Sequence, residues 1–229
     1  MSQNLLKRVV TSFILLILLL FINFSHQYIF ILSILMLGLI ICVEANNIFQ
    51  KILTPENFKK NFSSKKFDFK LIIFNLITFC YIFLIFCNLS YEIRISQSPI
   101  FFLYVISICF FTDIGGYVFG KIIGGKKLSK ISPNKTISGT LGSFICSIIP
   151  LTLIFDSYYL DLTFNLSNIL YCLLISLISQ LGDLIISYLK RKAKIKDSGK
   201  ILPGHGGVLD RVDGIIFAVP FSYLLLRLF

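Results

Sequence analysis

The residues best suited to chemistry lie in one stretch of this chain, Gln180–Gly214, between two apolar runs. The stretch contains seven Lys or Arg residues, four Asp residues, a His and a Gly-Gly pair. Fixed charge beside lipid costs free energy, so a membrane protein rarely keeps it without a use. Cations interleaved with Asp suit a polyanionic substrate that is held partly by Lys and Arg and partly by metal ions. The stretch therefore predicts phosphoryl or nucleotidyl transfer.

Three Asp residues of this stretch are candidate metal ligands. Asp183 lies within an apolar run, where an ionised Asp costs roughly 2.5–3.5 kcal/mol on insertion scales. The alternative for Asp183 is a helix-packing side chain bonded to a neighbour. Asp210 and Asp213 are three residues apart, so on a helix they share one face and could offer two hard oxygen ligands to Mg²⁺. The alternative is that both acids only start the last helix, where the helix dipole favours them.

A glycine-rich loop precedes the Asp pair. Pro203-Gly204-His205-Gly206-Gly207 can bring backbone N–H groups close to a phosphate. Alone this signal is weak, and it gains strength from Asp210 and Asp213 a few residues later. His205 either contacts a phosphate or only orders the loop.

The basic cluster after Asp183 contains two kinds of candidate. Lys190 and Arg191 follow Asp183 by two turns of one helix, so they could reach the same substrate. Lys192 and Lys194 fit the ordinary excess of cations at a cytoplasmic helix end.

Two upstream segments carry weaker candidates. Ser132, Lys135 and Thr136 stand just before an apolar run, where Ser, Lys and Thr fit phosphate binding at a helix N-terminus. The spacing is not that of a Walker A motif, and the alternative is an N-cap beside a loop proline. Asp113 lies near the end of another apolar run, where it either serves the site or marks the helix end.

The elements that position these residues are long apolar runs. The chain has 229 residues, of which 56% are hydrophobic and 14% charged, which is too apolar for a soluble domain. Seven runs approach the roughly 20 residues that a helix needs to cross hydrocarbon. The sequence therefore predicts an all-α polytopic membrane protein with about seven transmembrane helices. The predicted runs are Val9–Phe24, Tyr28–Val43, Leu71–Leu89, Ile100–Phe119, Ile137–Phe155, Leu166–Leu189 and Ile215–Leu228.

The distribution of cations orients these helices. Of the 22 Lys and Arg residues, all but Arg94 and Arg227 fall at the N-terminus or in the loops after the second, fourth and sixth runs. The positive-inside rule then predicts a cytoplasmic N-terminus and an external C-terminus. The same rule explains most of the net charge of +11, so that charge does not indicate nucleic-acid binding.

The chain divides by function into two regions. Residues 1–97 form an N-terminal transmembrane region without recognisable chemistry. Its segment Glu44–Lys70 is interpreted as a basic cytoplasmic linker, with an interfacial helix as the alternative. Residues 98–229 form the catalytic region. The six Cys residues lie in apolar segments without a CxxC pair and are interpreted as buried and reduced. The first run lacks a small-residue cleavage site and is interpreted as an uncleaved helix.

Several residues of the charged stretch form one pattern, Ser187-x-x-Lys190-Arg191, Lys196-Asp197 and Pro203-Gly204-His205-Gly206-Gly207-x-x-Asp210-Arg211-x-Asp213. This pattern resembles the signature of phosphatidate cytidylyltransferases, also called CDP-diacylglycerol synthases. Asp113-x-x-Gly116-Tyr117 with Gly120-Lys121, and Ser132–Gly139, are similar to two upstream elements of the family. Ser138 stands where the family pattern has Glu, so no acid role is assigned there.

The resemblance implies a reaction in which CTP and phosphatidic acid give CDP-diacylglycerol and pyrophosphate. It implies that Mg²⁺ or another divalent cation is held by Asp183, Asp210 and Asp213, and it leaves a monovalent cation and a homodimer open. The expected phosphate-neutralising residues are Lys190, Arg191, Arg211 and Lys135. The further substrate-binding candidates are Asp113, Ser132, Thr136, Lys196, Asp197, His205, Gly206 and Gly207. The expected location is the cytoplasmic membrane of a bacterium, with the site facing the cytoplasm and membrane lipids around it.

Other functions remain open on the residues alone. A CTP-dependent lipid kinase would phosphorylate an alcohol and would need His205 or Asp113 as a base. An anion transporter would usually show two related halves with broken helices, and this chain shows no repeat. The DGxxAR pattern of CDP-alcohol phosphotransferases is absent. The released product separates these classes: pyrophosphate, CDP or neither.

Overall fold

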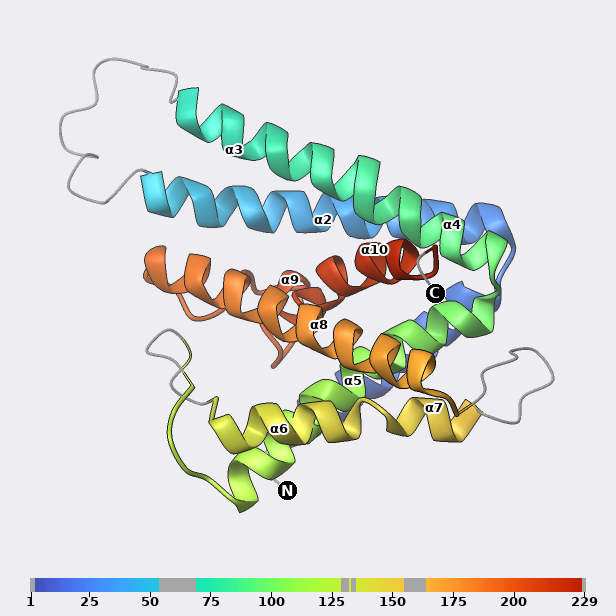
Figure 1. Cartoon of the computed structure of the whole chain (residues 1–229). Helices are drawn as coiled ribbons and strands as arrows, with labels where there is room; N and C mark the ends of the chain where they lie inside the picture. Colours follow the sequence, from blue (N-terminus) through green and yellow to red (C-terminus); the bar gives the residue numbers. More distant parts are fainter. Residues whose placement is uncertain (1–2, 54–68, 129–131, 133–134, 155–163, 228–229) are drawn as a thin grey trace, which may run out of the picture. The chain divides into compact units, whose positions relative to one another are not determined.

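The computed structural model describes residues 3–53, 69–128, 132, 135–154 and 164–227 (Figure 1). The regular structure of these residues is helical. Their strand-like pairings are limited to two isolated bridges, Lys127 with Thr136 and Leu202 with Gly206. The prediction of an all-α protein is therefore confirmed.

Residues 1–87 and 189–212 form one compact unit. Its helix α2 buries one stripe of side chains at helical spacing, including Phe30, Ile34, Ile41 and Ile48, and α3 packs along α2 (Figure 1). The unit consists of α1 (Gln3–Phe24), α2 (Gln27–Leu53), α3 (Phe69–Cys80), the π-helical segment η2 (Tyr81–Cys87), the last turn of α8 and the short α9 (Leu209–Val212).

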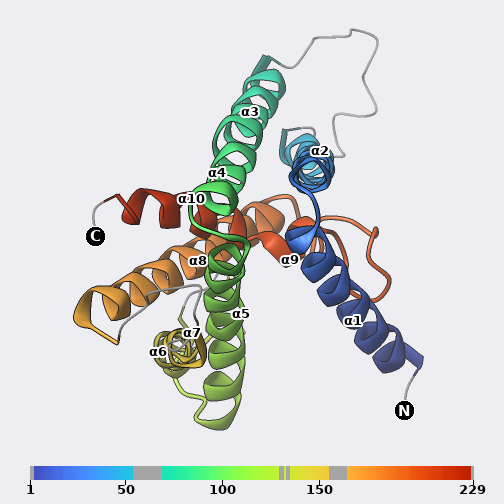
Figure 2. The same ribbon diagram turned by 90° about the vertical axis from the view of Figure 1, so that its right-hand side faces the viewer.

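Residues 88–188 and 213–229 form the second unit. Helices α5 and α6 pack closely in this unit (Figure 2). Gly115 permits the approach because it has no side chain, and a Cβ there would lie 2.5 Å from the Gly142 carbonyl oxygen. Thr112 of α5 donates a hydrogen bond of 2.9 Å to Ser176 of α8, and Ser143 of α6 donates one of 2.8 Å to the Thr112 carbonyl. The helices are α4 (Asn88–Ser96), α5 (Pro99–Ile122), α6 (Ile137–Cys146), α7 (Ile149–Ile154), α8 (Leu166–Lys192) up to Tyr188, and α10 (Ile215–Leu225).

Each of the seven predicted apolar runs is mostly helical over its described residues, although a turn at residues 147–148 divides the fifth run into α6 and α7. The chain is an integral membrane protein. Among the described residues, four helices are long and apolar enough to cross a membrane, and two further apolar helices are shorter. The four are Gln27–Leu53, Phe69–Ser96, Pro99–Ile122 and Leu166–Lys192, and the shorter two are Val9–Phe24 and Ile137–Leu153. Phe155 and Leu228, which end two predicted runs, lie outside the described residues.

One interpretation of the sequence is wrong. The segment Glu44–Lys70 is predicted as a linker or an interfacial helix, but residues 44–53 are the last ten residues of α2, which continues to Leu53. The helix continues because residues 44–53 contain neither Gly nor Pro and keep the buried stripe of α2 through Ala45 and Ile48. Residues 54–68 of the predicted linker lie outside the described part.

Candidate functional site

Asp210 holds the glycine-rich loop together in the first unit. One carboxylate oxygen accepts a hydrogen bond of 2.7 Å from Lys190 Nζ. The other accepts from the backbone N–H groups of Ser198, at 2.8 Å, and Gly207, at 2.9 Å. The side chains of Lys190 and Asp210 are only 12% and 7% exposed. Residues separated by up to 20 positions in the sequence thus form one buried, bonded set.

The electrostatic balance at Asp210 favours its ionised form. Burial raises the pKa of this carboxyl group. The Lys190 hydrogen bond, the backbone N–H groups of Gly207 and Ser198, and the Lys190 charge together outweigh burial and hold the pKa below its ordinary value. Asp210 is therefore a carboxylate that already has three donors.

The loop between these contacts forms a tight turn. Leu202 N donates to the Gly206 carbonyl at 2.9 Å, and Gly204 and Gly206 adopt φ angles of 77° and 84°. Only Gly takes this left-handed region without strain. Arg211 donates a hydrogen bond of 2.9 Å to the His205 carbonyl. The Gly207 N–H already donates to Asp210 and is therefore not turned toward a ligand. Phosphate binding by the backbone of Gly206-Gly207 stays a prediction.

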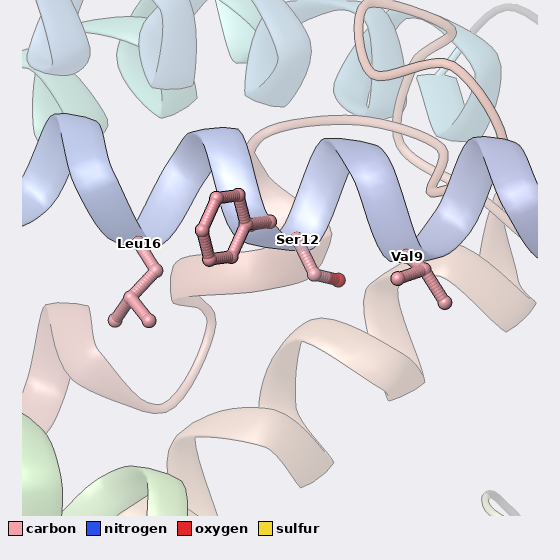
Figure 3. Close-up of a pocket in the computed structure, with 4 residues that line it drawn as sticks. Val9, Ser12 and Leu16 are labelled. Carbon is pink, nitrogen blue, oxygen red and sulfur yellow. The ribbon is translucent and has the colours of Figure 1, made fainter.

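His205 is held by hydroxyl groups of α1. Thr11 Oγ1 lies 2.6 Å from Nδ1 of the ring, and Ser12 Oγ lies 3.3 Å from Nε2. Both ring nitrogens are thus engaged, which favours the loop-ordering interpretation of His205. Ser12 also lines an open groove on α1 together with Val9, Phe13 and Leu16 (Figure 3). Sequence reasoning missed Thr11 and Ser12, whose only signal was two adjacent hydroxyls in an apolar run.

Glu44 of α2 is the second carboxylate that binds this loop. It is 2% exposed. Its oxygens accept hydrogen bonds from Ser198 Oγ at 2.7 Å, Val208 N at 3.0 Å and Leu209 N at 2.8 Å. Sequence reasoning missed Glu44 as well. The available signal was one carboxylate directly after the apolar run that ends at Val43.

A separate cluster in the second unit surrounds Asp183. Asp183 forms an ion pair with Lys135 and accepts a hydrogen bond of 3.1 Å from Ser187. Its carboxyl group also lies within hydrogen-bond reach of that of Asp213. The sequence placed both acids in one metal set, and this structure places these two together. Asp183 thus has partners both inside and outside its own helix.

Two glycines allow this close approach. A Cβ on Gly182 would lie 2.6 Å from the Phe217 ring and 2.9 Å from the Asp213 carbonyl oxygen. Gly214 faces the backbone of Ser179, where a Cβ would lie 2.9 Å from the carbonyl oxygen. The Asp213-Gly214 turn can therefore lie directly against α8.

The predicted Asp210–Asp213 helix face is not observed. Helix α9 ends at Val212, and Asp213 lies in the turn that follows it, where it accepts a hydrogen bond from Gly214 N. Gly214 is the N-cap of α10, and no side chain caps that helix there. The interpretation of these acids as simple caps of the last helix is therefore not supported.

The segment before α6 positions Lys135. Lys135 O accepts from Leu128 N at 2.8 Å, and Ile137 N donates to Lys126 O at 3.1 Å. Thr136 Oγ1 accepts from Gly139 N at 3.1 Å, which confirms the N-cap interpretation of Thr136. Ser138, at the position where Glu was expected, donates instead to the Gly124 carbonyl.

The remaining candidates differ in exposure. Ser132 is half-buried. The exposed candidates are Asp113, Arg191, Lys196, Asp197 and Arg211.

Two of the three candidate carboxylates are arranged in a way that fits a divalent metal ion. Within the described residues, no group of three or more His, Cys, Asp or Glu side chains is arranged to hold one. Mg²⁺ often takes only one or two carboxylates and completes its shell with water and substrate phosphates. The neighbouring carboxyl groups of Asp183 and Asp213 meet that requirement. Asp210 would have to exchange one of its three present donors.

Comparisons with known proteins identify the family. The model of the cytidylyltransferase family matches residues 48–229, so the chain belongs to that family. Proteins named phosphatidate cytidylyltransferase from Staphylococcus aureus (strain COL), Staphylococcus haemolyticus and Staphylococcus epidermidis are 43%, 40% and 41% identical to it over 167 residues. Each match spans 72% of this chain and 62% of the relative. The family expected from the signature residues is thus confirmed.

Proposed function

We propose that this protein transfers the cytidylyl group of CTP to phosphatidic acid, forming CDP-diacylglycerol and pyrophosphate. The observation that carries the proposal is the bonded set of Lys190, Ser198, Gly207 and Asp210, because the motif residues that suggested the reaction meet in one ordered loop. Family membership supports it, as do the names of the relatives.

The reaction needs little acid–base help from the protein. An oxygen of the lipid phosphate attacks the α-phosphorus of CTP, and the bond from that phosphorus to the β-phosphate oxygen breaks. Pyrophosphate leaves with the electron pair. A phosphate monoester has a second pKa of about 6, so it is already a dianion at neutral pH. The engagement of both His205 ring nitrogens agrees with a reaction that needs no free histidine base.

The second unit supplies carboxylates and a cation. Asp183 and Asp213 are proposed to hold Mg²⁺, which would neutralise phosphate oxygens when bound. Lys135 neutralises Asp183 in the present structure. We propose that Lys135 turns to a substrate phosphate when the carboxylates take the metal ion.

The first unit supplies an ordered loop with exposed cations around it. Lys190 is held by Asp210, whereas Arg191, Lys196 and Arg211 are exposed and can meet a polyanion. Positioning and charge neutralisation are the main contributions that joining two phosphates requires. Asp210 is proposed to order this loop, and its expected role as a metal ligand stays a prediction.

The proposed orientation places the loops with most cations in the cytoplasm of a bacterium, where CTP is available. The cation distribution supports a cytoplasmic N-terminus and seven spans. A reporter fused after Phe229 is then expected outside the cytoplasm. A cytoplasmic signal would contradict the seven-span orientation and leave the reaction untouched.

The direct test uses purified protein in mixed micelles with labelled CTP and phosphatidic acid. We expect CDP-diacylglycerol and one pyrophosphate per turnover, dependent on a divalent cation. Release of CDP with a phosphorylated alcohol would instead indicate a lipid kinase. If neither pyrophosphate nor CDP is released, the proposal of an enzyme of this class is overturned.

A further inference from the structure

Glu44 is buried where the pattern of its helix calls for an apolar residue. It lies on the stripe of α2 that also contains Ile41, Ala45 and Ile48, all of them buried. Burying a carboxylate is costly unless hydrogen bonds replace its water. Glu44 has three such bonds, and all three come from residues 198–209. Among the described residues, the hydrogen-bond partners of this carboxylate thus flank the glycine-rich loop on both sides, at Ser198 and at Val208 and Leu209.

The shape of the loop is adapted to the Glu44 side chain. A Cβ on Gly199 would lie 2.5 Å from Glu44 Oε1, and a Cβ on Gly207 would lie 2.5 Å from Oε2. Neither glycine has a left-handed φ angle, so backbone conformation does not require Gly at these positions. The absence of a side chain at both places makes room for the carboxylate.

Glu44 and Asp210 share the backbone donors that follow the turn of the loop. The consecutive N–H groups of Gly207, Val208 and Leu209 point to Asp210, Glu44 and Glu44 in turn. Ser198 is shared, because its N–H donates to Asp210 and its hydroxyl to Glu44. Loss of Glu44 would therefore release two backbone donors and one hydroxyl while the Lys190–Asp210 pair remains.

We propose that Glu44 is a positioning residue that holds residues 198–209 in their substrate-binding form before CTP arrives. This inference rests on the proposed function, and it concerns a residue outside the family match, which begins at residue 48. Without Glu44 the competent form of the loop is only fractionally populated, so substrate binding must also order it. The apparent dissociation constant then rises in inverse proportion to that fraction.

The test compares Glu44→Gln with wild type in two assays. Gln has the same shape but presents an amide N–H₂ to the backbone donors. We expect the KM for CTP to rise about tenfold and kcat to fall less than about threefold, because bound substrate can re-order the loop. In the absence of substrate, trypsin should cut after Lys200, which is exposed, at least about tenfold faster. Glu92→Gln, which changes the other Glu of the described part, should leave both measurements at wild-type values.

Two further variants keep the proposal testable if Glu44→Gln does not fold. Gly199→Ala places a methyl group against the Glu44 carboxylate, and Ser198→Ala removes one donor. Both should raise the KM for CTP and speed cleavage after Lys200, with the smaller change, about threefold, in Ser198→Ala. Wild-type values in both variants would overturn the proposal, as would a fall in kcat at unchanged KM in Glu44→Gln. If wild type makes no CDP-diacylglycerol, the proposed function fails, and the cleavage rates still decide whether Glu44 orders the loop.

Discussion

Gly182 is a position where one methyl group should disturb the pair of carboxylates Asp183 and Asp213. In Gly182→Ala the new Cβ would lie 2.6 Å from the Phe217 ring and 2.9 Å from the Asp213 carbonyl oxygen. The ring can rotate away, but the carbonyl can move only with the backbone that carries the Asp213 side chain. Overpacking of this kind costs about 1–3 kcal/mol. A shift of about 1 Å in a site can lower turnover about 10²-fold.

We therefore expect Gly182→Ala to lower CDP-diacylglycerol formation by about 10- to 100-fold and to lower the melting temperature in detergent. The rate is measured at saturating CTP and phosphatidic acid and at matched amounts of folded protein. Leu181→Ala is the control, since it leaves the same methyl group one residue away at an exposed position of α8. Near-normal activity of Gly182→Ala, with the control also active, would show that the Asp213 turn need not lie against α8 for catalysis.

The other predictions concern charged residues. Asp213→Asn should lower turnover at least about 10²-fold with insertion and folding intact, because an electrostatic contact to the transferring group is worth about 3–4 kcal/mol. If activity is retained across a Mg²⁺ titration, Asp213 is not a metal ligand. Lys190→Ala should strongly reduce activity, since it leaves the buried Asp210 without its cation. Lys192→Ala combined with Lys194→Ala should be nearly silent, because both side chains are exposed. Equal losses of activity would mean that the basic cluster acts only as a diffuse electrostatic field. The folded pKa of Asp210 is below that of the unfolded chain, about 3.9, so its stabilisation is present above about pH 4 and is lost as pH falls through the lower folded pKa. Melting temperatures between about pH 6 and pH 3 should then fall less steeply in Asp210→Asn than in wild type, and parallel curves would refute this linkage.

The sequence by itself determined the class of the protein and most of the residues of interest. Long apolar runs cannot satisfy their backbone in lipid except as helices, so composition alone predicted an all-α membrane protein. The spacing of Lys190, His205, Asp210 and Asp213 pointed to the family that the comparisons confirm. Apolar runs and motif spacing can be recognised from the sequence because they depend only on the type of residue and its spacing along the chain.

Only the tertiary structure decided which groups meet. Asp210 could have faced a ligand or its own loop, and the contact with Lys190 is set by how the chain returns to the end of α8. The partners of Glu44 lie more than 150 positions away along the chain, and no local period connects it to Ser198 or Leu209. Gly182 could be identified as a packing residue only once Phe217 and the Asp213 backbone were seen against it. Contacts between distant segments depend on how helices pack, and packing follows from the shapes of many side chains together, which no short motif encodes.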